Sequence, residues 1–164
     1  MMPEPGLPHR SGPLAFFLTW TTYGSWLPGD DRGWCDAAGG IRGPNPRLAL
    51  HAKRMLRHSR VDFGPRERCV VEAAVRQHCD FRGWQLHAVS CRTMHVHAAV
   101  TARDSSPDAV LASLKAWCSR ELSRQAGRRS RWWTRGGSAR LLFDTPAVAN
   151  VVTYVRECQD RPRV

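Results

Sequence analysis

The sequence has no apolar run long enough to span a membrane, and 42% hydrophobic residues is typical of a soluble globular chain. The N-terminus lacks the apolar core of a signal peptide. The six cysteines are scattered and include no Cys-x-x-Cys pair, so the usual spacing of a zinc ribbon is absent and reduced thiols are expected. These absences predict a cytoplasmic protein without a membrane segment.

Acidic residues are scarce: 14 Asp and Glu face 25 Lys and Arg, which gives a net charge of +11. Nearly all the cations are arginine, whose planar guanidinium binds phosphate through two hydrogen bonds. The charge favours a polyanionic partner, although a genome rich in G and C would also raise the arginine content. The length of 164 residues predicts one domain over 14–164, preceded by a flexible tail over 1–13.

Hydrophobic periodicity predicts alternating strands and helices. Strands are expected at 16–23, 84–90, 95–101, 131–134 and 139–143, and helices at 48–59, 65–81, 106–127 and 144–159. Residues 24–43 carry Gly, Pro and Asp at short intervals and are expected to form a long loop. The order predicts an α+β fold of the ferredoxin-like, split βαβ type. It would have an antiparallel sheet, helices on one face and an appended C-terminal helix.

The run His95-Val96-His97 lies in the third of these strands. Side chains alternate between the faces of a strand, so both imidazoles are expected on one face and Val96 on the other. Two neighbouring imidazoles could bind a metal ion, or they could simply be hydrogen-bonded at a sheet surface. The pattern alone leaves both interpretations open.

Tyrosine is rare, with Tyr23 and Tyr154 as the two in the chain. On the last predicted helix the valines form an apolar stripe, and Tyr154 falls on its flank, about 110° from the centre. Such a tyrosine is an ordinary boundary residue or a nucleophile with its hydroxyl in a cleft. Gln159 projects close to the valine stripe, where its amide needs a partner unless the last turn frays.

Arginines and two tryptophans gather in one segment. They are Arg120, Arg124, Arg128, Arg129, Arg131, Arg135, Trp132 and Trp133. Guanidinium groups for phosphates and indoles for stacked bases are typical of a single-strand binding groove. A solvated basic helix end with both indoles in the core is the competing interpretation.

In combination, the His-x-His strand, the downstream tyrosine helix with its glutamine and the strand order resemble the HUH single-strand endonucleases. Within that group the chain resembles the REP-associated tyrosine transposases, single-tyrosine insertion-sequence enzymes. The resemblance spans about residues 14–160. Three further segments carry it: 18–34, Arg135-Gly-Gly-Ser-Ala-Arg140 and Tyr154-Val-Arg-Glu-Cys-Gln159.

The resemblance implies a metal-dependent strand transferase acting on single-stranded or hairpin-flanked DNA. Tyr154 would form a 5′-phosphotyrosine link, and His95, His97 and Gln159 would bind Mg²⁺ or Mn²⁺. Many members place the glutamine four residues after the tyrosine, where this chain has Cys158, so Glu157 is a second candidate for the third ligand. The resemblance leaves both a homodimer and a monomer open.

Two alternatives come from other classes of protein. One is a non-catalytic single-stranded nucleic-acid-binding protein derived from a transposase. The other is a structural zinc protein that would use Cys79, His87, Cys91 and His95, although these lack close paired spacing. A plasmid- or phage-type nickase is disfavoured by the short chain.

Overall fold

The protein is described by a computed structural model that covers residues 12–36 and 38–157. The strands are β1 (Ala15–Thr21), β2 (Trp34–Cys35), β3 (Ile41–Arg42), β4 (Gln85–Cys91), β5 (His95–Thr101) and β6 (Ser138–Leu142). The helices are α1 (Pro46–Arg54), α2 (Pro65–Arg82), α3 (Pro107–Ala126) and α4 (Thr145–Glu157).

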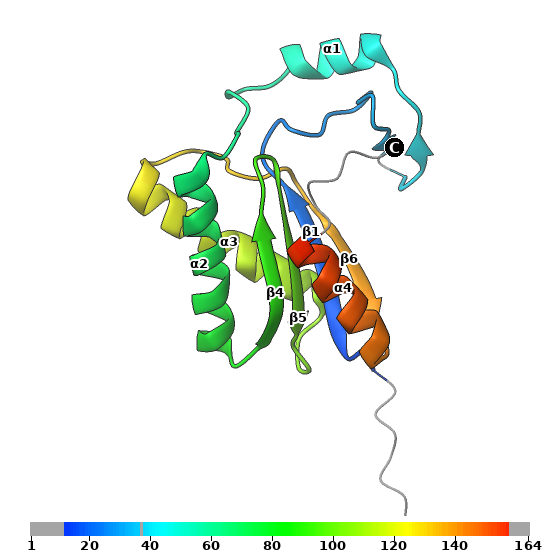
Figure 1. Ribbon diagram of the computed structural model, residues 1–164. Helices are drawn as coiled ribbons and strands as arrows, with labels where there is room; N and C mark the ends of the chain where they lie inside the picture. The colour runs from blue at the N-terminus through cyan, green and yellow to red at the C-terminus, as the bar shows by residue number, and fades with distance from the viewer. Residues whose placement is uncertain (1–11, 37, 158–164) are drawn as a thin grey trace, which may run out of the picture.

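Four strands form the central sheet in the order β4-β5-β1-β6, and every neighbouring pair is antiparallel. Helix α2 connects β1 to β4 and helix α3 connects β5 to β6 (Figure 1). This is the strand order of a ferredoxin-like split βαβ fold, so the predicted fold class is confirmed.

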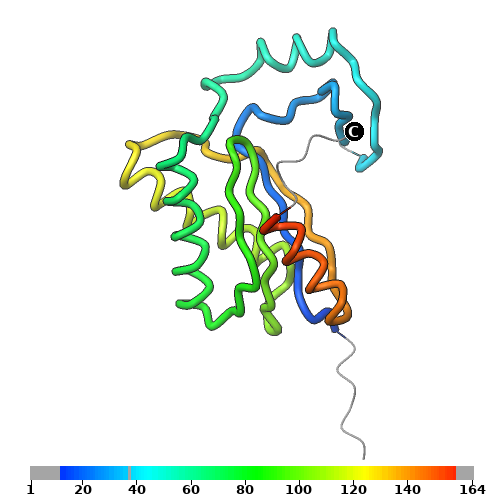
Figure 2. Tube along the Cα trace, in the orientation of Figure 1, coloured from blue at the N-terminus to red at the C-terminus, as the bar shows by residue number. Residues whose placement is uncertain are grey.

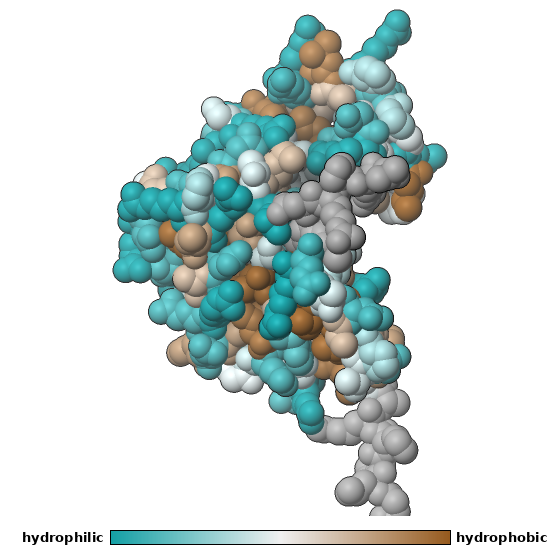
Figure 3. Space-filling view, viewed as in Figure 1, coloured by the Kyte–Doolittle hydropathy of each residue, from teal (hydrophilic) through white to brown (hydrophobic). Residues whose placement is uncertain are grey.

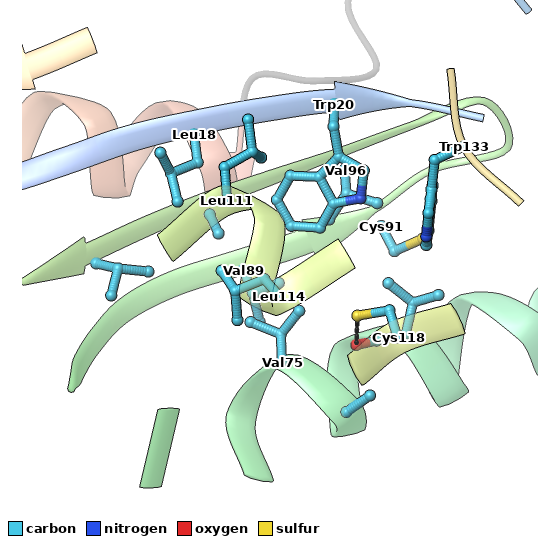
Figure 4. Packing of buried hydrophobic residues seen from close by; sticks show 14 of the residues in the cluster. Leu18, Trp20, Val75, Val89, Cys91, Val96, Leu111, Leu114, Cys118 and Trp133 are labelled. Atoms are coloured by element: carbon cyan, nitrogen blue, oxygen red, sulfur yellow. Dashed lines mark hydrogen bonds between the residues drawn. The ribbon is translucent and has the colours of Figure 1, made fainter. Parts of the chain in front are cut away.

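Helices α2 and α3 pack together on one face of the sheet, and most of the apolar core lies between them and the strands. Figure 4 shows Leu18 and Trp20 of β1 pointing to the side of the sheet on which Leu111 and Leu114 of α3 lie. Local signals set the helix ends. The Ser106 hydroxyl accepts the Ala109 N–H at the start of α3, and Gly83 ends α2 with a φ of +64°.

The last helix, α4, packs on the opposite face of the sheet, mainly on β4 and β5 (Figures 1 and 2). Val151 and Val155 are buried there with Ala88, Ala99 and other small apolar residues. The valine stripe predicted from the sequence therefore faces the sheet. The sheet has a large core on one side and a smaller one beneath α4.

Several predicted boundaries need correction. Residues 131–134 do not pair with β6 as a strand; Trp133 instead forms an isolated bridge with Thr22 of the chain leaving β1. The expected loop over 24–43 contains the short β2–β3 hairpin, and the helix expected at 48–59 spans Pro46–Arg54. The tail prediction falls almost entirely on residues that the structure does not describe.

The segment between β1 and α2 extends beyond the end of the sheet (Figure 1). Its helix α1 has no buried residue, and Leu50 and Met55 are exposed, in line with the apolar surface seen over this segment in Figure 3. Within the described residues, no helix is long and apolar enough to cross a membrane.

Candidate active site

Strand β5 places His95 and His97 side by side, with ring centroids 4.8 Å apart. Val96 between them is fully buried in the larger core, so the two imidazoles face the side of the sheet on which α4 packs. Periodicity alone predicted this arrangement.

The ring of His97 is fixed by Thr19 of the neighbouring strand β1. The two residues are directly opposite in the β1–β5 ladder, and His97 Nδ1 lies 2.8 Å from Thr19 Oγ1. With its proton on Nδ1, His97 donates to the Thr19 hydroxyl and keeps the lone pair of Nε2. Metal-binding histidines are commonly oriented by such a hydrogen bond through the other ring nitrogen.

Burial lowers the pKa of His97 from 6.5 to about 4, with smaller contributions from the neighbouring His95 and Arg92. The imidazole is therefore neutral at pH 7, which is the form that binds a metal ion. Burial also lowers the pKa of His78 and of His87.

These three histidines predict an acid-sensitive fold. The folded chain binds fewer protons on these histidines than the unfolded chain does below about pH 6.5. Their contribution to the stability is therefore fully present above that pH and is lost as the pH falls toward the lowered pKa values. We expect the urea midpoint in metal-free buffer to decrease between pH 7 and pH 5, and to decrease less in His78→Gln. An equal midpoint at both pH values would contradict the lowered pKa values.

Tyr154 lies next to the histidine pair. Its ring centroid is 5.7 Å from that of His97 and 6.0 Å from that of Phe17. The side chain is 41% exposed while Val151 and Val155 on the same helix are buried, which confirms its predicted place on the flank of α4. The second tyrosine, Tyr23, instead lies against His58.

Phe17 and Thr19 are parts of this site that sequence reasoning missed. The Phe17 ring stacks on His97 at 5.4 Å with an angle of 21° between the planes. The available signal was the alternation of Phe17, Thr19 and Thr21 on one face of the first strand. That alternation could not show that the strand pairs with the histidine strand.

Two of the three residues predicted to bind a divalent ion, His95 and His97, lie within the described residues. Gln159, predicted as the third, lies outside the described residues, and Glu157 is the exposed last residue of α4. Across residues 12–36 and 38–157, no group of three or more His, Cys, Asp or Glu could hold a metal ion.

The structural-zinc alternative is wrong for the same reason. Cys79 and Cys91 are buried in the larger core, whereas His95 faces the other side of the sheet. Burial raises the pKa of both thiols to about 12, so they are protonated and inert at neutral pH.

Trp132 and Trp133 do not present their rings to solvent, and the prediction that they stack bases is corrected here. Both are buried, at 7% and 8% exposure, and belong to the larger core. The Trp132 indole N–H donates to Ser123 Oγ, and the Trp133 indole N–H donates to Ser119 Oγ and the Lys115 carbonyl. The indoles therefore anchor this segment to α3.

We expect Trp133→Phe to lower the free energy of unfolding by about 1–3 kcal/mol, because the α3 acceptors lose their donor and part of the indole volume is left empty. The affinity for single-stranded DNA should not change. Urea unfolding and a fluorescence anisotropy titration measure the two quantities. A weaker affinity in a stable Trp133→Phe variant would restore the stacking interpretation.

The arginines predicted to bind DNA differ in their exposure and in whether their guanidinium groups have partners within the protein. Arg128, Arg131 and Arg135 are exposed, and Arg129, Arg131 and Arg135 line one open pocket together with Lys115. Arg129 donates to the Ser59 carbonyl and lies over Trp132. On α3, Arg124 pairs with Glu121 and Arg120 lies over Trp117.

The basic segment reaches the same end of the sheet as the histidines. The Thr134 N–H donates to the Thr21 carbonyl, while on its other side Thr21 is paired with His95 in the β1–β5 ladder. Thr21 thus separates the two segments, which places the backbone of Thr134, the residue before Arg135, two strand spacings, about 10 Å, from that of His95 across the sheet.

No family model and no curated protein matches the chain. Among the solved structures similar to it are two that each have 14% sequence identity over 94% of this chain. One is a REP-associated tyrosine transposase bound to a REP hairpin, with a TM-score of 0.47 over 70% of its length. The other is a candidate transposase from Deinococcus radiodurans R1, with a TM-score of 0.46 over 95%. Likeness at this level transfers no function to this chain.

Proposed function

We propose that the protein is a metal-dependent single-stranded DNA endonuclease and strand transferase that forms a phosphotyrosine intermediate. The observation that carries the proposal is the contact between Tyr154 and a pair of adjacent histidines. The Tyr154 ring lies 5.7 Å from His97, whose own ring lies 4.8 Å from His95. A phenol beside two imidazoles on one sheet face suits attack on a phosphodiester.

In the proposed reaction the Tyr154 oxygen forms a bond to phosphorus and the bond from phosphorus to the 3′ oxygen breaks. The phenol loses its proton to solvent, and the departing strand takes one up as a 3′-OH. The enzyme retains the 5′ phosphate, and attack by another 3′-OH reverses the step without ATP.

Mg²⁺ or Mn²⁺ held by His95 and His97 would supply positive charge to the phosphate oxygens. The third ligand in this proposal is Gln159, with Glu157 as the alternative. The residues of the chain prepare this position: Thr19 orients His97, and burial keeps its imidazole neutral. Phe17 packs against both His97 and Tyr154 and fixes the rings relative to each other.

Single-stranded DNA, hairpin-flanked in this proposal, would be held by the arginines of 120–135. The net charge of +11 and the exposed Arg128, Arg131 and Arg135 support a polyanion here. Trp132 and Trp133 are buried and offer no ring on which bases could stack, so this segment would bind the DNA through its phosphates.

The test uses single-stranded oligonucleotides from the DNA flanking the gene, labelled at either end and incubated with Mn²⁺ or with EDTA. A denaturing gel should show a covalent adduct with the 3′-labelled strand and a shorter free product with the 5′-labelled strand, in Mn²⁺ alone. An adduct that carries the 5′ label, or that forms in EDTA, would contradict the mechanism. Binding without any adduct would favour the non-catalytic DNA-binding protein.

A further inference from the structure

The face of the sheet that carries the histidines continues as a polar row across all four strands. In register, Ser90 is opposite His97, His97 is opposite Thr19, and Thr19 is opposite Ser138. Since α4 packs mainly on β4 and β5, two of the β6 residues of this face, Ser138 and Arg140, are exposed, whereas Leu142 at the end of β6 is buried in the smaller core.

Arg140 adjoins the reacting groups through a single aromatic ring. It lies directly opposite Phe17 in the β1–β6 ladder, and its guanidinium carbon is 5.5 Å from the centre of the Phe17 ring. The same ring stacks on His97 and meets the edge of Tyr154. The guanidinium of Arg140, the imidazole of His97 and the phenol of Tyr154 thus surround the ring of Phe17.

The guanidinium of Arg140 is available to an anion. Within the described part of the chain no carboxylate lies within ion-pair distance of it, whereas Arg32, Arg42 and Arg124 each bind one. A guanidinium resting on an aromatic face has its N–H groups directed along its own plane, where a phosphate can accept two hydrogen bonds.

The backbone that leads to Arg140 is held firmly against β1 and α3. A Cβ at residue 137 would lie 2.8 Å from the Thr19 carbonyl oxygen, so the close approach of β6 to β1 requires Gly137. The Lys115 ammonium donates to the carbonyls of Thr134 and Gly136. The Arg-Gly-Gly-Ser-Ala-Arg segment therefore positions Arg140 rather than forming a loose turn.

We propose that Arg140 binds a phosphate of the DNA strand adjacent to the phosphodiester that Tyr154 attacks. The inference rests on the proposed function for the identity of the strand, and it adds a contact outside the arginine-rich segment 120–135. Arg140 would hold the strand across β1, with the attacked phosphorus beside Tyr154 and the histidines.

The test measures binding without cleavage, in the Tyr154→Phe background. Arg140→Gln is compared with Arg103→Gln, which removes the same charge from an exposed residue just beyond the far end of β5. The probes are the flanking single-stranded oligonucleotides of the adduct assay, each carrying one uncharged methylphosphonate that is moved through successive positions. Arg140→Lys keeps the charge without the planar fork and should bind with intermediate affinity.

We expect Arg140→Gln to weaken binding of the all-phosphate strand about tenfold, and Arg103→Gln to have little effect. In the protein that retains Arg140, one methylphosphonate beside the cleavage position should also weaken binding about tenfold. In Arg140→Gln the same methylphosphonate should have no further effect. Equal losses in both glutamine variants, or additive losses at every phosphate, would overturn the inference. Thermal unfolding checks that the Arg140 variants fold, which its exposed position predicts.

The adduct assay separates the two proposals. If the wild-type chain forms the adduct but no phosphate is coupled to Arg140, only the inference about Arg140 fails. If one phosphate is coupled to Arg140 but no adduct forms, cleavage by Tyr154 is rejected and Arg140 is retained as a phosphate-binding residue.

Discussion

Tyr154→Phe is expected to abolish the covalent protein–DNA product while leaving the fold and the DNA affinity intact. The change removes one oxygen atom and retains the ring that packs against His97 and Phe17. Because the side chain is 41% exposed, the free energy of unfolding should change by no more than about 0.5 kcal/mol. A denaturing gel in Mn²⁺ measures the product, and urea unfolding measures the stability.

The chain offers a matched control for this variant, because Tyr23 is its one other tyrosine. The Tyr23 ring contacts His58 and its backbone N–H donates to the Trp132 carbonyl, away from the histidine pair. Tyr23→Phe should form the adduct at the rate of the parent. Residual adduct in Tyr154→Phe, or its loss in Tyr23→Phe, would contradict the assignment of the nucleophile.

His97→Ala should reduce the rate of adduct formation in Mn²⁺ by more than about a hundredfold, since loss of a mere supporting group around a metal costs 10- to 100-fold. It should also remove the stabilisation by Mn²⁺. At a metal concentration of 100 times Kd, the ion is expected to stabilise the parent by about 2.7 kcal/mol and the variant by almost nothing. Single-turnover kinetics and urea unfolding with and without Mn²⁺ give the two values.

His87→Ala is the control for the metal site. His87 is on β4, and its Nε2 lies 2.8 Å from Thr101 Oγ1, near the opposite end of β5 from His95. Its removal costs a local hydrogen bond but should preserve the Mn²⁺ response and the adduct. A Mn²⁺ response that survives in His97→Ala would show that the ion binds elsewhere.

Local periodicity was sufficient for much of the fold and for two parts of the site. The alternation in 95–101 gave the common face of His95 and His97, and the spacing of the valines gave the exposed flank for Tyr154. The strand and helix order gave the ferredoxin-like topology, because short connections leave few arrangements of such a chain. Each of these follows from neighbours within one element.

The parts that sequence reasoning missed depend on which elements lie side by side. The hydrogen bond between His97 and Thr19 and the contact of Arg140 with Phe17 follow from the register of β1 against β5 and β6. Composition was misleading for Trp132 and Trp133, because indoles beside arginines occur both in nucleic-acid grooves and in cores near a basic surface. The two rings are buried against Phe63 and, for Trp133, against Trp20, while Ser119 and Ser123 of α3 accept their N–H groups.

The most direct test identifies the amino acid that carries the DNA. After reaction in Mn²⁺, the adduct is digested with nuclease and trypsin, and the nucleotide-bearing peptide is sequenced by mass spectrometry. Cleavage after Arg140 and Arg156 yields residues 141–156, a peptide with Tyr154 as its one tyrosine. We predict a nucleotide linked through its 5′ phosphate to Tyr154. A nucleotide on any other peptide, or none on a protein that binds this DNA, would contradict the proposed function.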